Sequence, residues 1–249
     1  MTRSGLLVAA LAIVFSTPCA WGYRPFDSTD ADVAGAGEFE LELGPVGYLR
    51  EADERSIIEP AVVANFGLAG EREFVVEANR RRLLGGPADE PRSRIEDAGL
   101  FIKQMLRAGS LQQQQGPSVA TEFGLLLPGV HGESGTGASI AGILSQRWPD
   151  ATLHANLGIA LTREHRTAGT AGVILEGPYR WRLRPAVELF SVHESGSAEN
   201  SALIGAIWRQ SDALSLDAGW RTGRAQGEHV SEFRLGLTWR FDYVRRGRG

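Results

Sequence analysis

The chain of 249 residues contains a single cysteine, Cys19, and this cysteine lies inside an N-terminal segment that resembles a secretory signal. Small exported domains usually rely on disulfides when they cannot build a sufficient core. A mature chain without cysteine must be stabilised in another way. A closed β-barrel is one solution, because its backbone groups are all hydrogen-bonded from strand to strand.

Long apolar runs are also missing. After residue 22 no segment stays apolar over about 18 residues, the length expected of a transmembrane helix. Residues 1–22 carry Arg3, an apolar run over 5–15 and then small residues, which is the pattern of a signal peptide. The apolar run is too short to span a bilayer as a helix. We therefore expect export and a cleaved signal peptide, with cleavage after Ala20 and cleavage after Gly22 both left open.

Signals for catalysis, metals and nucleic acid are weak. The formal net charge is −4, and basic residues are dispersed except in the C-terminal tail, so nothing indicates nucleic acid as a partner. The five histidines lack the spacing of metal ligands. Residues 132–135 (GESG) resemble a serine-nucleophile turn, but the second glycine of that motif is missing. We predict that the protein is not an enzyme and uses no metal and no cofactor.

The chain is instead rich in residues that alternate between apolar and polar. In residues 232–241 (EFRLGLTWRF) every second residue is apolar, and successive side chains of a strand point to opposite faces. The same rhythm recurs along the whole chain. It predicts about twelve strands, at 38–43, 57–66, 73–79, 97–106, 118–127, 140–146, 152–161, 170–176, 182–191, 201–209, 214–222 and 232–241.

The connections favour a membrane barrel. Long polar connections are expected at 45–56, 84–96, 128–137, 163–169, 192–200 and 223–230, and most of the others are tight. Aromatic residues gather at the tight-turn end, namely Trp148, Tyr179, Trp181, Trp208 and Trp239. Both features are typical of outer-membrane barrels with long loops outside and short turns in the periplasm. We predict an all-β fold, a single up-and-down antiparallel transmembrane β-barrel of about 12 strands. A lipocalin-like barrel or a sandwich is the alternative.

This interpretation divides the chain into four parts: a signal peptide at 1–22, a periplasmic entry segment or plug at 23–37, the barrel at 38–241 and a basic tail at 242–249. The entry segment contains Asp27, Asp30 and Asp32, but it lacks the glycine and the distal glutamate of a calcium loop. We expect it to be a solvated, turn-rich lead-in. The location implied is the outer membrane of a Gram-negative cell.

The polar face of the strands defines a candidate lumen. The residues expected to line it, and to form any solute path, are Glu38, Glu40, Glu42, Glu73, Glu77, Asp97, Lys103, Glu122, His154, Asn156, Glu188, Arg209, Arg234 and Arg240. Because the last strand must pair with the first, Arg234 and Arg240 should face the first three of these glutamates. The charges either pair and fill the barrel or line a water-filled path, and both outcomes stay open.

Several stretches together resemble the outer-membrane family named for a phenol-degradation pathway. They are RPFDSTDA, GEFELELG, EDAGLFIKQML, GPSVATEFGLLLPG, LHANLG, VELF and LGLTWRF, and they span nearly the whole mature chain. The resemblance implies a β-barrel that passes small, often hydrophobic, compounds. It also implies that Glu40, Asp97, Lys103, Glu122, Asn156 and Glu188 point inward. The chain departs from the family at Pro128-Gly129, where Pro-Thr-Gly is usual, and in the eight residues after Phe241.

The predicted function is a channel or transporter for small molecules, hydrophobic and aromatic ones included, without catalysis. The expected partners are outer-membrane lipid, a small-molecule solute and the barrel-assembly machinery. Two alternatives remain open: a non-conducting structural or surface-binding barrel with a charge-filled lumen, and a lipid-modifying enzyme. The solute, the oligomeric state and the role of residues 23–37 are not determined by the sequence.

Overall fold

The computed structural model describes residues 23–85 and 91–243, so the expected signal peptide and most of the C-terminal tail lie outside the described residues. It contains twelve strands and one short 3-10 helix, η1 (Ser110–Gln112). The strands are β1 (Glu38–Glu51), β2 (Glu54–Leu68), β3 (Arg72–Leu83), β4 (Ser93–Arg107), β5 (Ser118–Leu126), β6 (Gly137–Arg147), β7 (Thr152–Leu161), β8 (Thr167–Glu176), β9 (Leu183–Glu194), β10 (Ser197–Arg209), β11 (Leu214–Ala225) and β12 (Glu228–Asp242). Among the described residues, no helix is long and apolar enough to cross a membrane.

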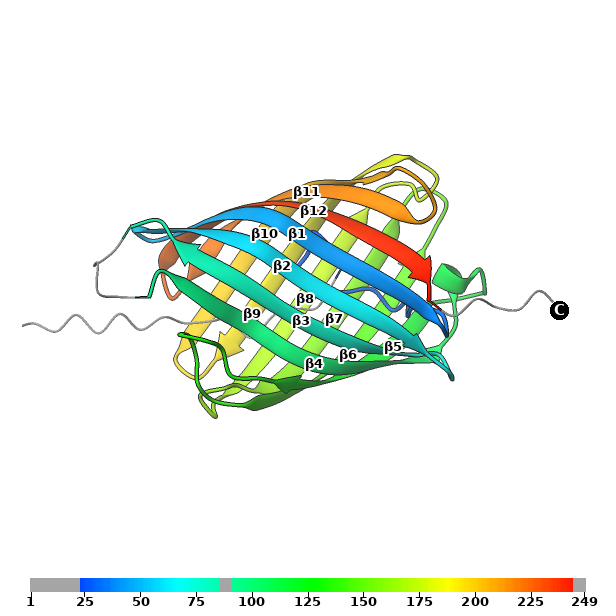
Figure 1. The fold of residues 1–249 in the computed structure, drawn as a ribbon. Coiled ribbons are helices and arrows are strands. Elements are labelled where there is room, and N and C mark those ends of the chain that lie inside the picture. The colour runs from blue at the N-terminus through cyan, green and yellow to red at the C-terminus, as the bar shows by residue number, and fades with distance from the viewer. Residues whose placement is uncertain (1–22, 86–90, 244–249) are drawn as a thin grey trace, which may run out of the picture.

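Each strand pairs antiparallel with its neighbours in the chain, and β1 pairs with β12, so the sheet closes on itself (Figure 1). The closing seam matches Phe39 with Phe241, Glu40 with Arg240 and Leu41 with Trp239. The predicted up-and-down barrel and its first-to-last pairing are therefore confirmed. The lipocalin-like barrel, with its eight strands, and the open sandwich are excluded.

The strands are longer than predicted at the end of the barrel away from the described chain ends. Long loops were expected at 45–56, 192–200 and 223–230, but the turns there span only residues 52–53, 195–196 and 226–227. The prediction was wrong because a backbone ladder continues where side-chain alternation breaks, as at the register shift between Leu43 and Val46. Positive φ angles at Ala52, Gly196 and Gln226 fit such tight hairpins. The long connections at this end are residues 84–92 and 127–136.

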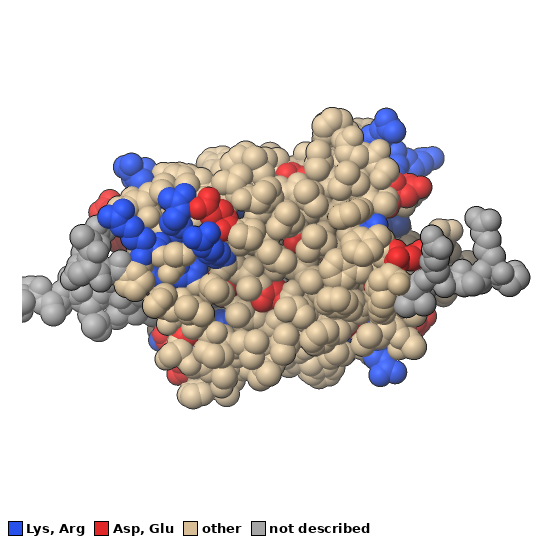
Figure 2. Space-filling view, viewed as in Figure 1, with Lys and Arg blue, Asp and Glu red and all other residues tan. Residues whose placement is uncertain are grey.

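The outer face of the barrel is apolar. Its most exposed large side chains include Leu157, Leu189, Leu106 and Ile204, each more than 60% exposed. Figure 2 shows one face that is mostly uncharged in the middle apart from a few Asp and Glu atoms, with Lys and Arg gathered toward the two ends. Exposed apolar surface of this extent is found where lipid covers it, and Trp148, Trp181, Trp208 and Trp239 are about half exposed near the end of the barrel where the described chain ends lie. The predicted outward face is confirmed.

The interior is mixed rather than uniformly polar. One apolar cluster joins Phe26 to Ile174, Leu203 and Ile207 on the inner wall, and another joins Val75, Phe101 and Leu126. Many carboxylates and basic side chains are also buried in the interior. Only the polar part of this interior could be predicted, because apolar residues on the inner face break the alternation from which the lumen was inferred.

Candidate functional site: a polar lumen occupied by residues 23–37

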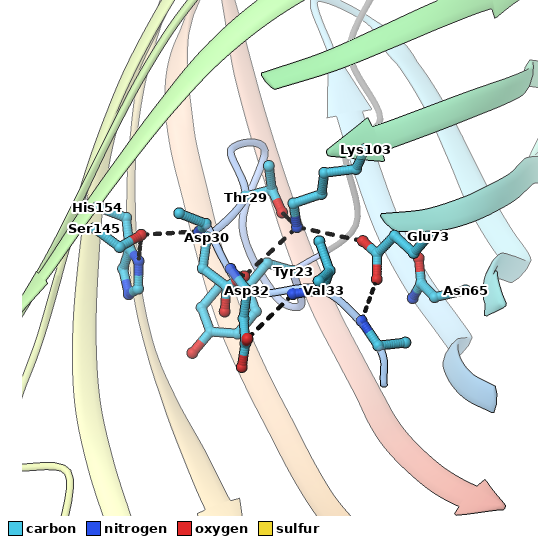
Figure 3. A network of polar contacts seen from close by, with 12 residues as sticks. Tyr23, Thr29, Asp30, Asp32, Val33, Asn65, Glu73, Lys103, Ser145 and His154 are labelled. Atoms are coloured by element: carbon cyan, nitrogen blue, oxygen red, sulfur yellow. Dashed lines mark hydrogen bonds and ion pairs between the residues drawn. The ribbon is translucent and has the colours of Figure 1, made fainter. Parts of the chain in front are cut away.

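Residues 23–37, called the lumen segment below, run through the interior of the barrel up to the start of β1 (Figure 3). Thr29 is 1% exposed, Ala31 is fully buried and Asp27 is 8% exposed. The expectation of a solvated lead-in is therefore wrong. The physical reason is that the polar groups of the segment find partners on the inner wall, which compensates them for the water they lose.

The lumen segment is held mainly through its backbone. Seven of its N–H groups donate to side chains of the barrel strands, and those side chains are Glu42, Glu188, Asn156, Ser145, Glu73 and Glu38, with Glu188 accepting two. Five of these six residues belong to the predicted lumen set. The structure brings them together around the protein's own chain, so their hydrogen-bonding capacity is used internally.

Glu188 binds two adjacent backbone N–H groups of the lumen segment. Its two carboxylate oxygens accept the backbone N–H groups of Asp27 and Ser28 at 2.8 and 2.7 Å, and Glu188 is 1% exposed. Gly172, on the neighbouring strand β8, makes room for the segment, because a Cβ there would lie 1.8 Å from Ser28 Oγ. Charge-assisted hydrogen bonds of this kind are about twice as strong as neutral ones.

Asn156 and a chain of polar side chains hold the next residues. The Asn156 amide accepts from Thr29 N at 3.2 Å and donates to Thr29 O at 2.8 Å, which imitates one rung of a β-ladder. Ala31 N donates to Ser145 Oγ at 2.9 Å, and Ser145 lies 2.7 Å from His154 Nδ1. Through these contacts two predicted lumen residues, Asn156 and His154, support the lumen segment.

Glu176 continues this chain of contacts to the beginning of the segment. Its Oε1 lies 3.1 Å from His154 Nε2 and accepts a hydrogen bond from the Tyr23 hydroxyl at 2.5 Å. Burial and the negative charge of Glu176 raise the pKa of Tyr23 well above its usual value, so the hydroxyl stays protonated and donates.

Lys103, the single lysine of the sequence, lies at the centre of the acidic side of the lumen. Its ammonium group is 3.4 Å from Glu73 Oε1, 3.6 Å from Asp30 Oδ1 and 3.3 Å from Thr29 Oγ1 (Figure 3). Glu73 in turn accepts the Ala34 N–H at 2.6 Å. One buried cation therefore joins Glu73 of the barrel wall to Thr29 and Asp30 of the segment, and Glu73 extends the contact to Ala34.

Two arginines of the barrel wall bind Asp27. Arg234 Nη2 lies 2.7 Å from Asp27 Oδ1, and Arg221 Nη1 lies 3.7 Å from Asp27 Oδ2. Arg221 also pairs with Glu199 at 2.7 Å and with Glu232 at 3.1 Å. Predicted Arg234 therefore points inward as expected, but it faces Asp27 and Glu232 rather than the glutamates of the first strand.

The seam behaves as predicted at one position. Arg240 pairs with Glu40, its register partner, at the mouth of the barrel near the chain ends. Glu38 accepts the Gly35 N–H at 3.0 Å, and Glu42 accepts from Arg24 N at 3.0 Å and Asn65 Nδ2 at 3.2 Å. Of the two arginines expected to face the glutamates of the first strand, Arg240 does so and Arg234 does not.

The remaining predicted residues lie away from the lumen segment. Glu77 and Glu122 are 5% and 4% exposed, and Glu77 Oε2 and Glu122 Oε1 find no hydrogen-bond partner within the described part of the chain. Asp97 accepts from Asn79 Nδ2 at 3.0 Å. The guanidinium of Arg209 is 5.6 Å from the ring of Tyr179, near the mouth where the described chain ends lie. Across residues 23–85 and 91–243, no group of three or more His, Cys, Asp or Glu side chains could hold a metal ion.

Among the described residues, small cavities of about 100 Å³ each lie at two places beside the lumen segment. The first lies between Tyr23, Pro25 and the inner face of β1 and β2, at Gly44 and Gly47. The second lies beyond Asp27 toward the far mouth, and its lining is polar: Arg81, Glu96, Asp97, Asn79, Glu199, Arg221, Glu232 and Arg234 are among its residues. Each could hold a few water molecules, but neither is as large as a typical ligand pocket of about 300 Å³ or more.

Sequence reasoning missed several residues of this interior. Glu176, Glu232 and Ser145 all make contacts described above but were not predicted to line the lumen, whereas Arg221 was expected to point inward and does. Glu232 has the inward-facing position of its strand, so the alternation could have identified it. Ser145 gave no such signal, because a serine on a strand is common on either face.

The fold has counterparts among solved structures. The COG4313 outer membrane channel from Pseudomonas putida F1 superposes with a TM-score of 0.61 at 11% identity, covering 87% of this chain and 100% of that one. The NanC porin gives 0.57 at 8% identity, with 81% and 98% covered, and the KdgM porin in complex with disordered oligogalacturonate gives 0.55 at 8% identity, with 81% and 99% covered. No protein-family model matches the chain, and no curated protein matches it significantly. At these identities the comparisons establish the fold, a twelve-stranded barrel of the kind found in outer-membrane porins and channels.

Proposed function

We propose that the protein is an outer-membrane channel for small molecules whose lumen segment closes the path and must move for solute to pass. The observation that carries the proposal is the way the segment is held. Seven backbone N–H groups are bound by wall side chains, while no residue of the segment before Glu38 belongs to a strand. A segment held by side chains can be released without opening the barrel's own ladder.

The wall left behind on release would suit a conducting path. Glu42, Glu73, Lys103, Asn156, Glu188 and Arg234 are the main side chains that the segment now covers. Both signs of charge would then face water, which is the arrangement that selects polar solutes in channels. The apolar patch of Val75, Phe101 and Leu126 lies on the same inner wall, so solutes with an aromatic or aliphatic part could also be accommodated.

The proposal includes the membrane and its orientation. The apolar outer face calls for lipid, and a closed barrel is one of the two structures that can satisfy its backbone in a bilayer. We place the chain ends and the tryptophan-rich rim in the periplasm. The resemblance to the phenol-degradation family supports small hydrophobic or aromatic compounds as the solute class.

The second candidate is a barrel that never conducts. It is favoured by the density of ion pairs inside, since Lys103, Arg221 and Arg234 each bridge two or more carboxylates. In that case the lumen segment is simply part of the core, and its removal would destabilise the barrel without creating a path.

Single-channel recording distinguishes the two candidates. A variant that lacks residues 23–34 should conduct steadily, whereas the full chain should be closed for most of the time with brief openings. Retained heat-modifiable migration on gels would show that the variant is folded. A folded variant without conductance would refute the channel. If the variant conducts, liposome swelling with charged, sugar-like and aromatic solutes would identify the solute class.

A further inference from the structure

The outer face of the barrel carries a group of basic side chains at the end away from the chain ends. It consists of Arg50 on β1, Arg55 on β2, and Arg80 and Arg82 on β3, and we call it the arginine patch. Arg50, Arg55 and Arg80 are exposed, and the Arg82 side chain is 39% exposed. Figure 2 shows basic side chains grouped at this end, where Figure 1 places the β1–β2 hairpin.

The side chains of the patch point outward, not into the lumen. On β1, Leu49 is buried inside and its neighbours Tyr48 and Arg50 are exposed. On β3, Arg81 is buried and pairs with Glu51, Glu54 and Glu96, while Arg80 and Arg82 flank it on the opposite face. The patch therefore borders the same surface that lipid is expected to cover.

The backbone register places these charges unusually close together. Arg50 and Arg55 are direct register partners on β1 and β2, and Arg82 is the partner of Ile57, two residues beyond Arg55. Direct partners have Cβ atoms about 5 Å apart and diagonal neighbours about 7–8 Å apart, and like charges placed opposite one another are destabilising. Such an arrangement calls for an anion that bridges the guanidinium groups.

Protein groups compensate this charge only in part. Glu59 pairs with Arg82, Ser93 Oγ accepts from Arg80 Nε at 3.0 Å, and Ala52 O accepts from Arg50 Nε at 3.4 Å. Glu59 is the one carboxylate paired with the patch among the described residues, and no described residue forms an ion pair with Arg50 or Arg55.

The patch also lies at the height of lipid headgroups. Leu41 pairs with Trp239 at the aromatic rim near the chain ends, and Arg50 is nine residues further along β1. A membrane strand needs about 9–11 residues to cross the hydrocarbon. Tyr48 precedes Arg50 on the same face and is 42% exposed, as interfacial aromatic residues are. Arg50 and Arg55 thus reach the headgroup layer of the leaflet opposite the chain ends.

We propose that the arginine patch binds the phosphate groups of lipid A, the bisphosphorylated glycolipid of the outer leaflet. Planar guanidinium groups bind phosphate oxygens in a bidentate fashion, and several of them on one rigid sheet can hold both phosphates of one headgroup. The acyl chains would lie along the apolar face below the patch, beside Val46 and Tyr48. The inference rests on the outer-membrane orientation proposed above, but not on conduction.

Binding of lipid A to the purified full chain in detergent tests the proposal, measured by native mass spectrometry or by fluorescence titration. The double variant Arg50→Gln/Arg55→Gln removes the opposed pair. The matched control is Arg180→Gln/Arg182→Gln, which removes two exposed arginines from the opposite rim. Heat-modifiable migration on gels verifies that both variants are folded, so lost binding cannot be confused with lost structure.

We expect the patch variant to bind lipid A at least tenfold more weakly, with the control within about twofold of the unmodified chain. Lipid A without its phosphates should bind the unmodified chain as weakly as bisphosphorylated lipid A binds the patch variant. Equal binding by the patch variant and the unmodified chain would overturn the proposal. So would equal affinity for phosphatidylglycerol, the expected result if the patch faced the inner leaflet, or saturation of the patch by millimolar inorganic phosphate alone. None of these outcomes depends on whether the barrel conducts.

Discussion

Replacing Glu188 by glutamine should release the lumen segment without unfolding the barrel. Glu188 accepts the Asp27 and Ser28 N–H groups at 2.8 and 2.7 Å with its two carboxylate oxygens. Glutamine keeps one acceptor oxygen but turns an NH₂ group toward the second N–H, so one charge-assisted hydrogen bond is lost. Bonds of that kind contribute about 1.5–3 kcal/mol each. The ratio of closed to open channels should therefore fall about 10- to 150-fold.

Single-channel open probability measures this shift, and Glu77→Gln is the matched control. Glu77 is an inward, 5% exposed glutamate that makes no hydrogen bond to the lumen segment among the described residues. Loss of a buried carboxylate alone should affect both variants alike. If Glu188→Gln opens the channel no more than Glu77→Gln does, while removal of residues 23–34 opens it, then Glu188 does not hold the lumen segment in the closed state.

Three further variants test other contacts. Lys103→Met leaves Asp30 and Glu73 without their shared cation, so it should raise open probability and lower the free energy of unfolding by about 3–5 kcal/mol in a denaturant titration; an unchanged unfolding midpoint would contradict the bridging role. Arg240→Gln removes a pair whose arginine is 46% exposed, so it should cost no more than about 1 kcal/mol, and a large loss would mean that side chains rather than the backbone ladder close the seam. Burial and the negative charge of Asp30 raise the pKa of Asp32 in the closed state. Asp32 therefore binds a proton more tightly in the closed channel than in the open one, and acidification from neutral pH toward about 4 should favour closure by protonating Asp32. Asp32→Asn should flatten that part of the pH profile of open probability, and coincident profiles for the two chains would refute it.

The barrel could be predicted from the sequence because its determinants are local. Alternation in 232–241 and 152–161 reflects lipid on one face and lumen on the other, and each strand carries that pattern independently of its partners. The ends of strands were less predictable. In β9 and β11 the backbone ladder continues beyond the regular alternation, and pairing across the sheet, not side-chain pattern, decides where the turn falls.

The lumen segment could not be placed from the sequence. Its residues have no periodicity, and its partners lie far away in the chain: Thr29 and Asn156 are separated by 127 residues, and Arg24 and Leu235 by 211. The alternation along the strands identified Glu188, Asn156 and Lys103 as lumen residues, but it does not say which groups their side chains contact. The aspartates of the segment were a usable signal, because a lumen with buried arginines and lysine needs acidic partners.

A reversible disulfide between Ser28→Cys and Gly172→Cys tests the central claim most directly. A Cβ at Gly172 would lie 3.1 Å from Ser28 Cβ, close to the separation of about 3.5–4.5 Å found in disulfides, and Cys19, inside the expected signal peptide, is the sequence's single native cysteine. We predict a silent channel when this pair is oxidised and restored openings after a reductant is added to the same bilayer. Equal conductance before and after reduction, with the disulfide verified by mass spectrometry, would contradict the account that the lumen segment closes this barrel.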